Sequence, residues 1–337
     1  MKILVALSGG VDSTVAAYKL KQEGHKIEGV YMKLYSDPST HKANIEKVKK
    51  VSDFLKIKYH VLNLEDKFNS LVYTPFIKTY EDGLTPNPCV LCNRKIKFGE
   101  LLDFAKELGM DKLASGHYAQ IIDGLLTEAF DKSKDQSYFL ANLNKNSLNR
   151  ILFPLGKMLK KDVKQIALSI KVLQEFATQK ESSEICFVPQ AYTDILKKHM
   201  DIDKAGDVLN IKGEVVGQHK GYMHYTIGKR RGFTVKGAHD AHYVISINAK
   251  TNEIVVGLKE DLDIKEFKVR DINMFVEDKN FNCFVKIRYR SPKCACSIHV
   301  NKTNASVKLD EKLQGLAAGQ MAVFYKDSKV VGGGWIE

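Results

Sequence analysis

The stretch MKILVALSGGVDSTVAAYKLKQEG, residues 1–24, decides the fold. Its apolar start, Lys2–Leu7, has the length of a buried strand, and Val11–Glu23 has the composition of a helix that ends at Gly24. Glycines in the turn between them let the backbone approach an anion closely, and the free N–H groups of a helix start attract phosphate. SGGVDS, residues 8–13, therefore predicts a phosphate-binding turn between a strand and a helix.

This turn departs from the Walker pattern, G-x-x-x-x-G-K-[ST], because no lysine follows the glycines. The residues leave an alternative open, a tight strand-to-helix turn in which Ser or Asp only caps the helix. The intact hexapeptide directly after a strand favours phosphate binding. Asp12 is then a candidate ligand for a Mg²⁺ ion that accompanies the phosphates, since Mg²⁺ prefers oxygen ligands.

Strands and helices alternate through the first half of the chain. We expect strands at Lys2–Leu7, Ile27–Met32, Tyr59–Leu64 and Lys112–Ser115, separated by helices near residues 11–23, 45–55, 68–80 and 96–108. This alternation predicts an α/β fold with a parallel sheet covered by helices on both faces. Ligands of such sheets bind beyond the carboxyl ends of the strands.

The pattern of predicted elements changes past about residue 200, where short strands are separated by turn residues. Evenly spaced strands of this kind, among them Phe284–Tyr289, predict a small β-barrel. We therefore expect an α/β catalytic domain over residues 1–195, a small mixed central domain over 196–263 and a C-terminal β-barrel over 264–337.

Composition limits the partners and the location that we expect. The chain has 337 residues, with 52 Lys and Arg against 40 Asp and Glu, and a formal net charge of +12. This excess favours a polyanionic partner such as nucleic acid, although a basic balance can also serve solubility alone. No apolar run approaches the ~20 residues that span a bilayer, and the start lacks the pattern of a secretory signal. A cytoplasmic location with reduced cysteines is therefore expected.

A second informative stretch is NPCVLCNRKIK, residues 87–97, which contains a C-x-x-C pair, Cys89 and Cys92. Such a pair is typical of half a zinc site, of a dithiol redox centre, or of a loop that carries one reactive thiol. Cys92 directly precedes a predicted helix start that contains several basic residues. A helix start and nearby cations lower the pKa of a thiol, so Cys92 is the candidate nucleophile.

The other cysteines give weaker signals. Cys186 lies between an acidic and an apolar segment, where packing into the core is the plain alternative. Cys294 and Cys296 have strand spacing and share a face, so they could complete a zinc site with the C-x-x-C pair only through a contact between domains. Pro86 and Pro88 precede the C-x-x-C pair rather than splitting it, which argues against a thioredoxin-like dithiol.

Eight motifs together resemble one family. In chain order they are SGGVDS (8–13), GVYMK (29–33), TPNPCVLCN-x-x-IKF (85–98), SGHYA (115–119), KDQSYFL (134–140), EICFVP (184–189), RYRSP (288–292) and GQMAVFY (319–325). This set resembles the bacterial tRNA-specific 2-thiouridylase family (MnmA/TrmU), within the PP-loop ATP pyrophosphatase superfamily. The resemblance covers nearly the whole chain. It implies that ATP adenylates C2 of uridine 34 in tRNAs for Lys, Glu and Gln, and that persulfide sulfur then gives 2-thiouridine with release of AMP and pyrophosphate.

The resemblance also implies roles for individual residues. Cys186 would carry the persulfide and Cys92 would attack it, leaving a Cys92–Cys186 disulfide, while sulfur leaves as hydrogen sulfide or passes directly to the base. The residues implied for ATP, with Mg²⁺, are Ala6, Leu7, Ser8, Gly9, Gly10, Val11, Asp12, Ser13, Met32 and Gly116. Those implied for tRNA or the target base are Asn87, Pro88, Cys89, His117, Lys134, Asp135, Gln136, Arg288, Tyr289 and Gln320. The implied sulfur donor is a cysteine desulfurase or a sulfur-relay protein, and we expect a monomer.

The chain departs from the family pattern at two places. Many relatives have Asp where this chain has Cys89, and a thiol with a reference pKa of about 8.5 cannot simply replace a carboxylate at about 3.9. Residues 181–184 read ESSE, where relatives more often have Asp-Ser-Thr-Gly. Two other functions stay open at this point: a PP-loop ligase that acts on a small molecule, and a non-catalytic zinc-bearing RNA-binding protein.

Overall fold

The computed structural model describes residues 1–35, 38–178, 185–188, 190–237 and 239–337. Its first part contains a five-stranded sheet in the order β3-β2-β1-β4-β7, in which every pair is parallel. The strands are β1 (Lys2–Ala6), β2 (Lys26–Lys33), β3 (Tyr59–Asn63), β4 (Lys112–Ala114) and β7 (Ile151–Leu152). The predicted α/β fold with a parallel sheet is confirmed.

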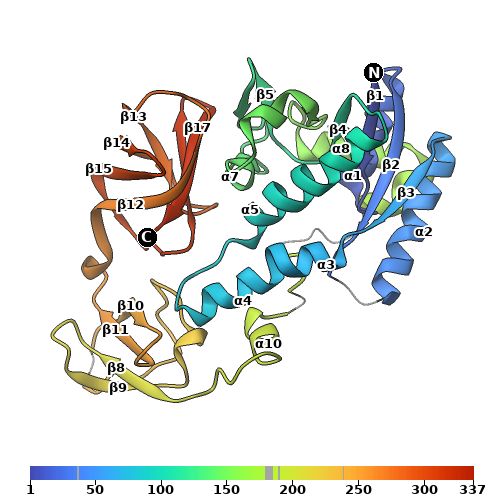
Figure 1. Cartoon of the computed structure of the whole chain (residues 1–337). Helices are drawn as coiled ribbons and strands as arrows, with labels where there is room; N and C mark the ends of the chain where they lie inside the picture. Colours follow the sequence, from blue (N-terminus) through green and yellow to red (C-terminus); the bar gives the residue numbers. More distant parts are fainter. Residues whose placement is uncertain (36–37, 179–184, 189, 238) are drawn as a thin grey trace.

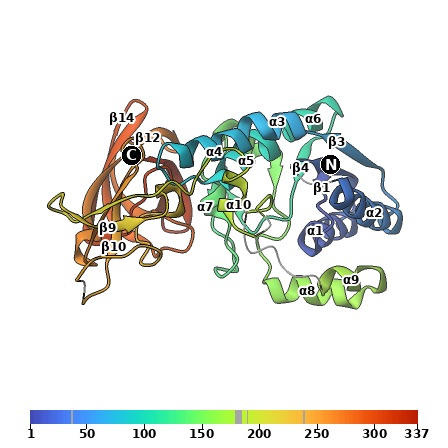
Figure 2. The same ribbon diagram turned by 90° about the horizontal axis from the view of Figure 1, so that it is seen from below.

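Helices cover both faces of this sheet because β1 is apolar on both sides. Ile3 and Val5 pack against α1 (Val11–Gln22), α2 (Pro38–Leu55) and α8 (Lys160–Ser169). Leu4 points to the opposite face and packs with residues of α6 (Leu101–Glu107), as successive strand residues must. Figure 2 shows α8 and α9 (Gln174–Ala177) on one side of the domain and α3 to α6 on the other.

Two long helical segments run beside the sheet and join it to the rest of the molecule (Figure 1). The first comprises α3 (Glu65–Phe68), the π-helical η1 (Asn69–Tyr73) and α4 (Thr74–Glu81). The second comprises α5 (Pro88–Cys92), the π-helical η2 (Asn93–Glu100) and α6. The remaining short helices are α7 (Ser137–Leu140), η3 (Lys145–Arg150), η4 (Lys171–Leu173), α10 (Tyr192–Leu196), η5 (Tyr222–His224) and η6 (Glu260–Leu262).

The second helical segment begins earlier than the sequence predicted. We expected a helix start just after Cys92, but helical backbone begins at Pro88, whose fixed φ and missing N–H suit the first position of a helix. Cys92 is therefore the last residue of α5 and lies inside a continuous helical run, not before its start.

The second part is a small mixed sheet with strand order β10-β11-β8-β9. Its strands are β8 (Gly206–Leu209), β9 (Val215–His219), β10 (Tyr243–Asn248) and β11 (Glu253–Gly257). It is mixed because β8 runs parallel to β11 while the other pairs are antiparallel. Its core is small and centres on Tyr225.

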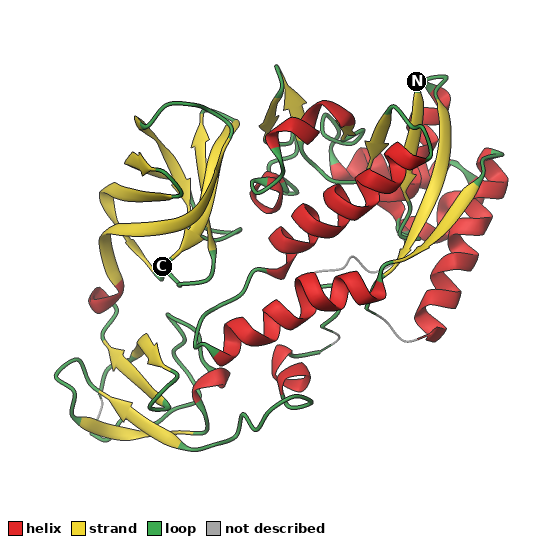
Figure 3. Cartoon of the chain, viewed as in Figure 1, coloured by secondary structure: helices red, strands yellow, loops and turns green. Residues whose placement is uncertain are grey.

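The third part is a closed six-stranded antiparallel barrel, as predicted; strands dominate this half of the molecule, and helices the other (Figure 3). Its strands are β12 (Asp263–Met274), β13 (Asn280–Lys286), β14 (Cys294–Asn301), β15 (Asn304–Gln314), β16 (Met321–Lys326) and β17 (Lys329–Ile336). The expected strand Phe284–Tyr289 ends at Lys286, so Arg288 and Tyr289 lie in the turn that follows β13.

The barrel and the α/β domain share structure. A hairpin of β5 (Gln120–Ile122) and β6 (Leu125–Thr127) leaves the α/β domain and pairs with β17 of the barrel. One hydrophobic cluster joins Leu4 and Val30 of the parallel sheet with Val323 and Val330 of the barrel. The two parts therefore form a common core. Within the described residues, no helix is long and apolar enough to cross a bilayer.

Candidate functional site

A cleft of about 1130 Å³ opens at the carboxyl ends of β1, β2 and β4. All the residues that the sequence analysis connected with ATP line it, namely Ala6, Leu7, Ser8, Gly9, Gly10, Val11, Asp12, Ser13, Met32 and Gly116. Of the other predicted residues, Cys186, His117, Lys134, Asp135, Gln136 and Tyr289 line the same cleft. The structure thus brings segments from opposite ends of the chain to one cavity, at the edge where ligands of parallel sheets bind.

The turn after β1 has the geometry of an anion-binding loop. Gly9 has a φ of 80°, a left-handed conformation that favours glycine, and Gly10 stands directly before α1. The Ser13 hydroxyl donates to the carbonyl of Gly10 at 3.0 Å and accepts from the backbone N–H of Ser8 at 3.2 Å, which folds the loop over the helix start. Gly116 packs against this start so closely that a Cβ there would lie 2.8 Å from the Ser13 nitrogen.

Asp12 is held by a residue that sequence reasoning missed. Lys160 Nζ lies 2.6 and 2.7 Å from the two Asp12 carboxylate oxygens, and Tyr118 Oη donates to Asp12 Oδ1 at 2.8 Å. Lys160 is only 8% exposed, and its own backbone N–H donates to Asp131 Oδ2 at 2.9 Å. No local pattern distinguishes Lys160 from its lysine neighbours, because its partner Asp12 lies 148 residues away. The cleft therefore contains a buried cation beside the anion-binding loop.

The thiols of Cys89, Cys92 and Cys186 lie close enough for their charges to interact. Cys92 is buried, Cys89 is half-buried and Cys186 is exposed. Burial raises the pKa of Cys92 to about 12 and that of Cys89 to about 11, with the charge of Cys186 adding to both shifts and that of Lys97 opposing them. The expectation that Cys92 has a lowered pKa is therefore wrong for this state of the protein. Burial outweighs the nearby cation, and Cys92 is not at the helix start.

Of the three basic residues at positions 94, 95 and 97, Lys97 is the one that lines the cleft. Arg94 donates to the carbonyl of Asn142 at 2.6 Å, and Lys95 is exposed. Lys97 lines the cleft and lies 3.4 Å from His117 Nε2. Burial and the Lys97 charge hold the pKa of His117 well below its usual range, so the neutral ring accepts from Lys97.

The residue after Cys186 anchors it. Phe187 is 5% exposed and meets the rings of Phe68, Tyr73 and Phe76 edge-on, with centroids 5.4, 5.7 and 5.2 Å away. The alternative that Cys186 packs in the core is wrong, since Phe187 fills that place and leaves the Cys186 thiol exposed at the cleft. The departure at residues 181–184 lies outside the described residues.

Two members of the predicted tRNA segment support the loop around them. The Asp135 carboxylate accepts from the backbone N–H of Ala129 at 2.8 Å and from the hydroxyl of Ser137 at 2.7 Å. The Gln136 side chain accepts from the backbone N–H of Tyr118 at 3.0 Å. Together with Lys134 they line the cleft, and Lys132, Lys286 and Arg290 add further positive charge that sequence reasoning did not assign.

Most of the remaining predicted residues lie outside the lining of the cleft, and Tyr289 lies within it. Asn87 and Gln320 are hydrogen-bonded at 3.4 Å, between the start of α5 and the barrel. Arg288 Nη2 donates to the carbonyl of Ile227 at 3.1 Å, which ties the barrel to the central domain. Tyr289 lies in the cleft lining and packs on Phe139 at a centroid distance of 4.6 Å. Pro88 is buried at the start of α5.

The sequence analysis also missed an exposed basic triplet in the central domain, KRR at residues 229–231. Three consecutive basic residues are a pattern that can be recognised from sequence alone. Lys229 is tied down, since its Nζ donates to the carbonyl of His224 at 2.6 Å and lies 5.1 Å from the ring centre of Tyr225. Arg230 and Arg231 are exposed beside it. This loop offers two guanidinium groups to a polyanion.

The described residues give no support to a zinc site, since no three His, Cys, Asp or Glu side chains among them group as metal ligands. Cys296 lies in the barrel core, with its sulfur 3.6 Å from that of Cys283.

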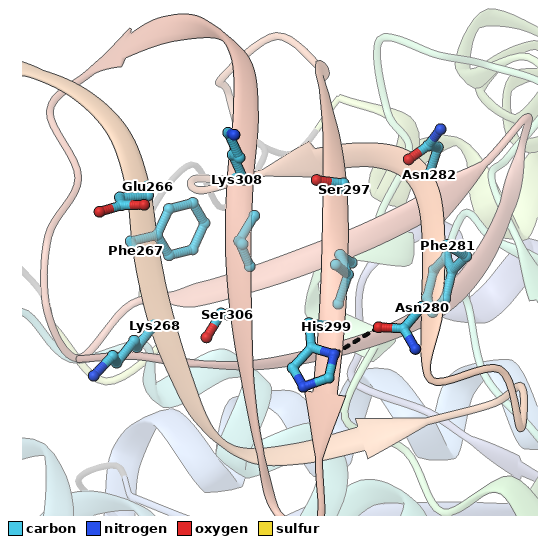
Figure 4. A pocket seen from close by; sticks show the side chains of 12 residues that line it. Glu266, Phe267, Lys268, Asn280, Phe281, Asn282, Ser297, His299, Ser306 and Lys308 are labelled. Carbon is cyan, nitrogen blue, oxygen red and sulfur yellow. Dashed lines mark hydrogen bonds between the residues drawn. The ribbon is translucent and has the colours of Figure 1, made fainter.

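A second hollow, of about 820 Å³, lies across β12, β15, β14 and β13. Polar residues such as Lys308 and His299 alternate in it with apolar ones (Figure 4). None of the predicted site residues lines it.

Three family models match the chain in order. Residues 1–190 match the "tRNA methyl transferase HUP domain", residues 193–258 the "tRNA methyl transferase PRC-barrel domain" and residues 264–336 the "Aminomethyltransferase beta-barrel domain". Among solved structures, a 4-thiouridine synthetase in complex with RNA and bound ATP is 17% identical with a TM-score of 0.36, covering 58% of this chain and 49% of that chain.

Curated relatives match over the full length. The protein named "tRNA-specific 2-thiouridylase MnmA" from Campylobacter lari is 58% identical over 337 residues, which are 100% of both chains. The protein of the same name from Campylobacter jejuni serotype O:6 is 56% identical over 338 residues, again 100% of both chains. With this identity over its whole length, the chain belongs to the MnmA family of tRNA-specific 2-thiouridylases.

Proposed function

We propose that this tRNA 2-thiouridylase, a sulfurtransferase, adenylates C2 of uridine 34 in tRNAs for Lys, Glu and Gln with ATP and then delivers persulfide sulfur to that carbon. The observation that carries the proposal is the single cleft shared by the phosphate loop and the exposed Cys186 thiol. ATP use follows from the PP-loop fold. Activation is needed because a carbonyl oxygen is a poor leaving group, whereas AMP is a good one.

The chain's own residues would bind and neutralise the triphosphate. Backbone N–H groups of residues 8–13 at the start of α1 would hold phosphate oxygens. Lys160, which pairs with Asp12 at 2.6 Å, would turn its charge toward the phosphates. Asp12 then offers carboxylate oxygens to Mg²⁺, a role that fits because Asp12 lines the cleft and because Lys160, which pairs with its Oδ2, would turn to the phosphates. Bound Mg²⁺ would supply further neutralisation of phosphate charge.

Sulfur would arrive on Cys186, whose exposure lets a cysteine desulfurase or a sulfur-relay protein reach it. The thiolate of Cys92 attacks the inner sulfur of the Cys186 persulfide, forming the Cys92–Cys186 disulfide and releasing hydrosulfide. Hydrosulfide displaces AMP from C2 of the uridine, and an external thiol later reduces the disulfide. In the alternative form of this step, the outer sulfur of the persulfide passes directly to C2 of the base without release of hydrosulfide. We also propose that the enzyme works as a cytoplasmic monomer.

The proposal predicts that pyrophosphate release from ATP requires tRNA. Purified protein with ATP, Mg²⁺ and unmodified tRNA for Lys, Glu or Gln should release pyrophosphate, and mass spectrometry of the nucleosides should find 2-thiouridine once a persulfide donor is added. Omitting the tRNA should reduce release to background. Equal release without tRNA would instead support a ligase that acts on a small molecule.

The exposed Arg230 and Arg231 side chains are proposed to contact tRNA phosphates. Replacing both with alanine should weaken tRNA binding about 3- to 10-fold at low salt and lower the slope of log Kd against log salt by about 1 to 2, because fewer counterions are released. Fluorescence titration at several salt concentrations measures both. Lys229→Ala is the matched control, since Lys229 is already bound within the domain. An unchanged slope in the double variant would contradict this phosphate role.

A further inference from the structure

The connector between α4 and α5, residues 82–87, determines where the catalytic helix begins. It leads directly into Pro88, the first residue of the helix that carries Cys89 and Cys92. Figure 1 shows that it runs past both the barrel and the central domain, and contacts from each hold it. The connector that leads to the thiols is therefore contacted by two domains that lie later in the chain.

The central domain holds the start of the connector. The hydroxyl of Tyr222 donates to the carbonyl of Glu81 at 2.6 Å, at the last residue of α4. Gly83 has a φ of 76°, and a Cβ there would lie 3.2 Å from the Cβ of Ala249. The start of the connector thus packs against Ile247 and Ala249 of the central domain, which leave little space for a side chain at position 83.

The barrel holds the end of the connector through the loop between β15 and β16. Gln320 Nε2 donates to the carbonyls of Pro86 at 2.8 Å and Thr85 at 3.2 Å, and its Oε1 accepts from Asn87 Nδ2 at 3.4 Å. The backbone N–H of Thr85 donates to the carbonyl of Ala318 at 2.9 Å. An amide side chain has two N–H donors, so both donors of Gln320 are used within the protein.

Two neighbouring residues favour this close contact between the connector and the loop from β15 to β16. Gly319 has a φ of 87°, and a Cβ there would lie 2.9 Å from the Thr85 carbonyl oxygen, so the loop approaches at a distance that only glycine permits. Asn87 is the residue before α5 and belongs to a type that commonly caps a helix with its side chain. Here the side chain makes no cap bond and is directed to Gln320 instead.

We propose that Gln320 is a positioning residue, which clamps the connector and so fixes the distance between Cys92 and Cys186. The proposal rests on the proposed function of these two thiols. It differs from the tRNA contact that family resemblance implies for Gln320, because its donors face the connector rather than a ligand. The reaction then depends on the barrel through an intramolecular bond, in addition to whatever the barrel contributes to tRNA binding.

The test compares Gln320→Glu with Gln320→Lys in the full-length enzyme. Glutamate loses both donors and places negative charge against two carbonyl oxygens, so kcat should fall about 10- to 100-fold while the KM for tRNA stays within about twofold. Lysine can donate to both carbonyls and should recover most of kcat. A rise in KM with unchanged kcat in Gln320→Glu would overturn the proposal, as would an equal loss of kcat in both variants.

A second readout reports directly on the thiols. After one turnover and acid quench, the Cys92–Cys186 disulfide joins tryptic peptide 79–94 to peptide 181–197, and the yield of this pair should fall with kcat in Gln320→Glu. If that variant fails a thermal-melting control, Gly319→Ala replaces it, since its methyl group pushes against Thr85 and leaves Gln320 intact. Full kcat in folded Gly319→Ala would overturn the clamp. A wild-type enzyme that yields no 2-thiouridine would instead refute the proposed function.

Discussion

Replacing Cys186 or Cys92 with serine is expected to lower 2-thiouridine formation at least about 10³-fold. A serine hydroxyl at position 186 cannot carry a persulfide, and at position 92 it is a far weaker nucleophile toward sulfur than a thiolate. The substitutions are nearly isosteric, so α5 and the Phe187 anchor should remain in place. Mass spectrometry of nucleosides from tRNA incubated with each variant, ATP and a persulfide donor measures the effect.

The two variants should fail at different steps. Cys186→Ser should retain no donor-derived sulfur, whereas Cys92→Ser should accumulate the persulfide on Cys186 without passing it on. Both should still release pyrophosphate in the presence of tRNA, because adenylation uses the phosphate loop and not the thiols. Normal thiolation by either variant would refute the assigned roles.

Cys89→Ser is the matched control, because Cys89 lies on the same helix as Cys92 and its pKa is likewise raised by burial and opposed by Lys97. We expect partial activity, since Cys89 occupies the segment proposed to face the target base but carries no sulfur in the proposed reaction. Loss as complete as in Cys92→Ser would make Cys89 a sulfur carrier or a proton-transfer group. An unchanged rate would make it a space-filling residue.

The raised pKa of Cys92 adds a pH dependence to this prediction. A thiol attacks as thiolate, and below a pKa of about 12 the thiolate fraction rises about tenfold per pH unit. Sulfur transfer in a single turnover should therefore become faster between about pH 7 and pH 9, as long as this step limits the rate. Lys97→Met should slow it at every pH in that window, because Lys97 opposes the upward shift. A rate that is flat with pH would contradict a raised pKa of Cys92 in the reacting complex.

Removing the charge of Lys160, the buried cation that pairs with Asp12 of the proposed phosphate loop, should have the second large effect. Lys160→Met should lower tRNA-dependent pyrophosphate release about 10²- to 10³-fold, the usual cost of losing one group that stabilises developing charge. The variant loses a cation beside the proposed phosphate site and also removes the charged partner of Asp12, which keeps the hydrogen bond from the Tyr118 hydroxyl. Release of labelled pyrophosphate measures the effect.

Lys161→Met is the matched control for this experiment. Lys161 is the next residue along the chain but is exposed, and it is not among the residues that line the cleft. Its replacement should change the rate by less than about twofold, as is usual for surface positions away from a site. Equal loss in both variants, or near-normal release by Lys160→Met, would remove Lys160 from the proposed phosphate site.

The features that were predictable from sequence are those encoded by short segments. SGGVDS after an apolar run requires only local geometry to form a turn with Gly9 in a left-handed conformation, and the structure contains it. The alternation of strands and helices likewise led to the correct parallel sheet. Cys186 came from the family motif, since its local pattern pointed to the core instead.

The features that were missed depend on residues far apart in the chain. Lys160 meets Asp12 across 148 residues, and Gln320 meets Asn87 across 233. The pKa of Cys92 was misjudged for the same reason. Its nearest cations are visible in the sequence, but the burial that outweighs them comes from packing with residues such as Phe76 and Leu196. Long-range packing decided each of these cases.

The pairing of the β5–β6 hairpin with β17 has a consequence for protein synthesis. Because β17 follows every other described element, the ribosome makes it after the phosphate loop, both cysteine segments and the central domain are already outside. Domains usually fold as they emerge, but here Leu4 and Val30 share their core with Val330. We therefore expect that the nascent chain stays incomplete at its catalytic centre until the barrel closes, so that an interrupted translation product leaves no partly active enzyme competing for tRNA.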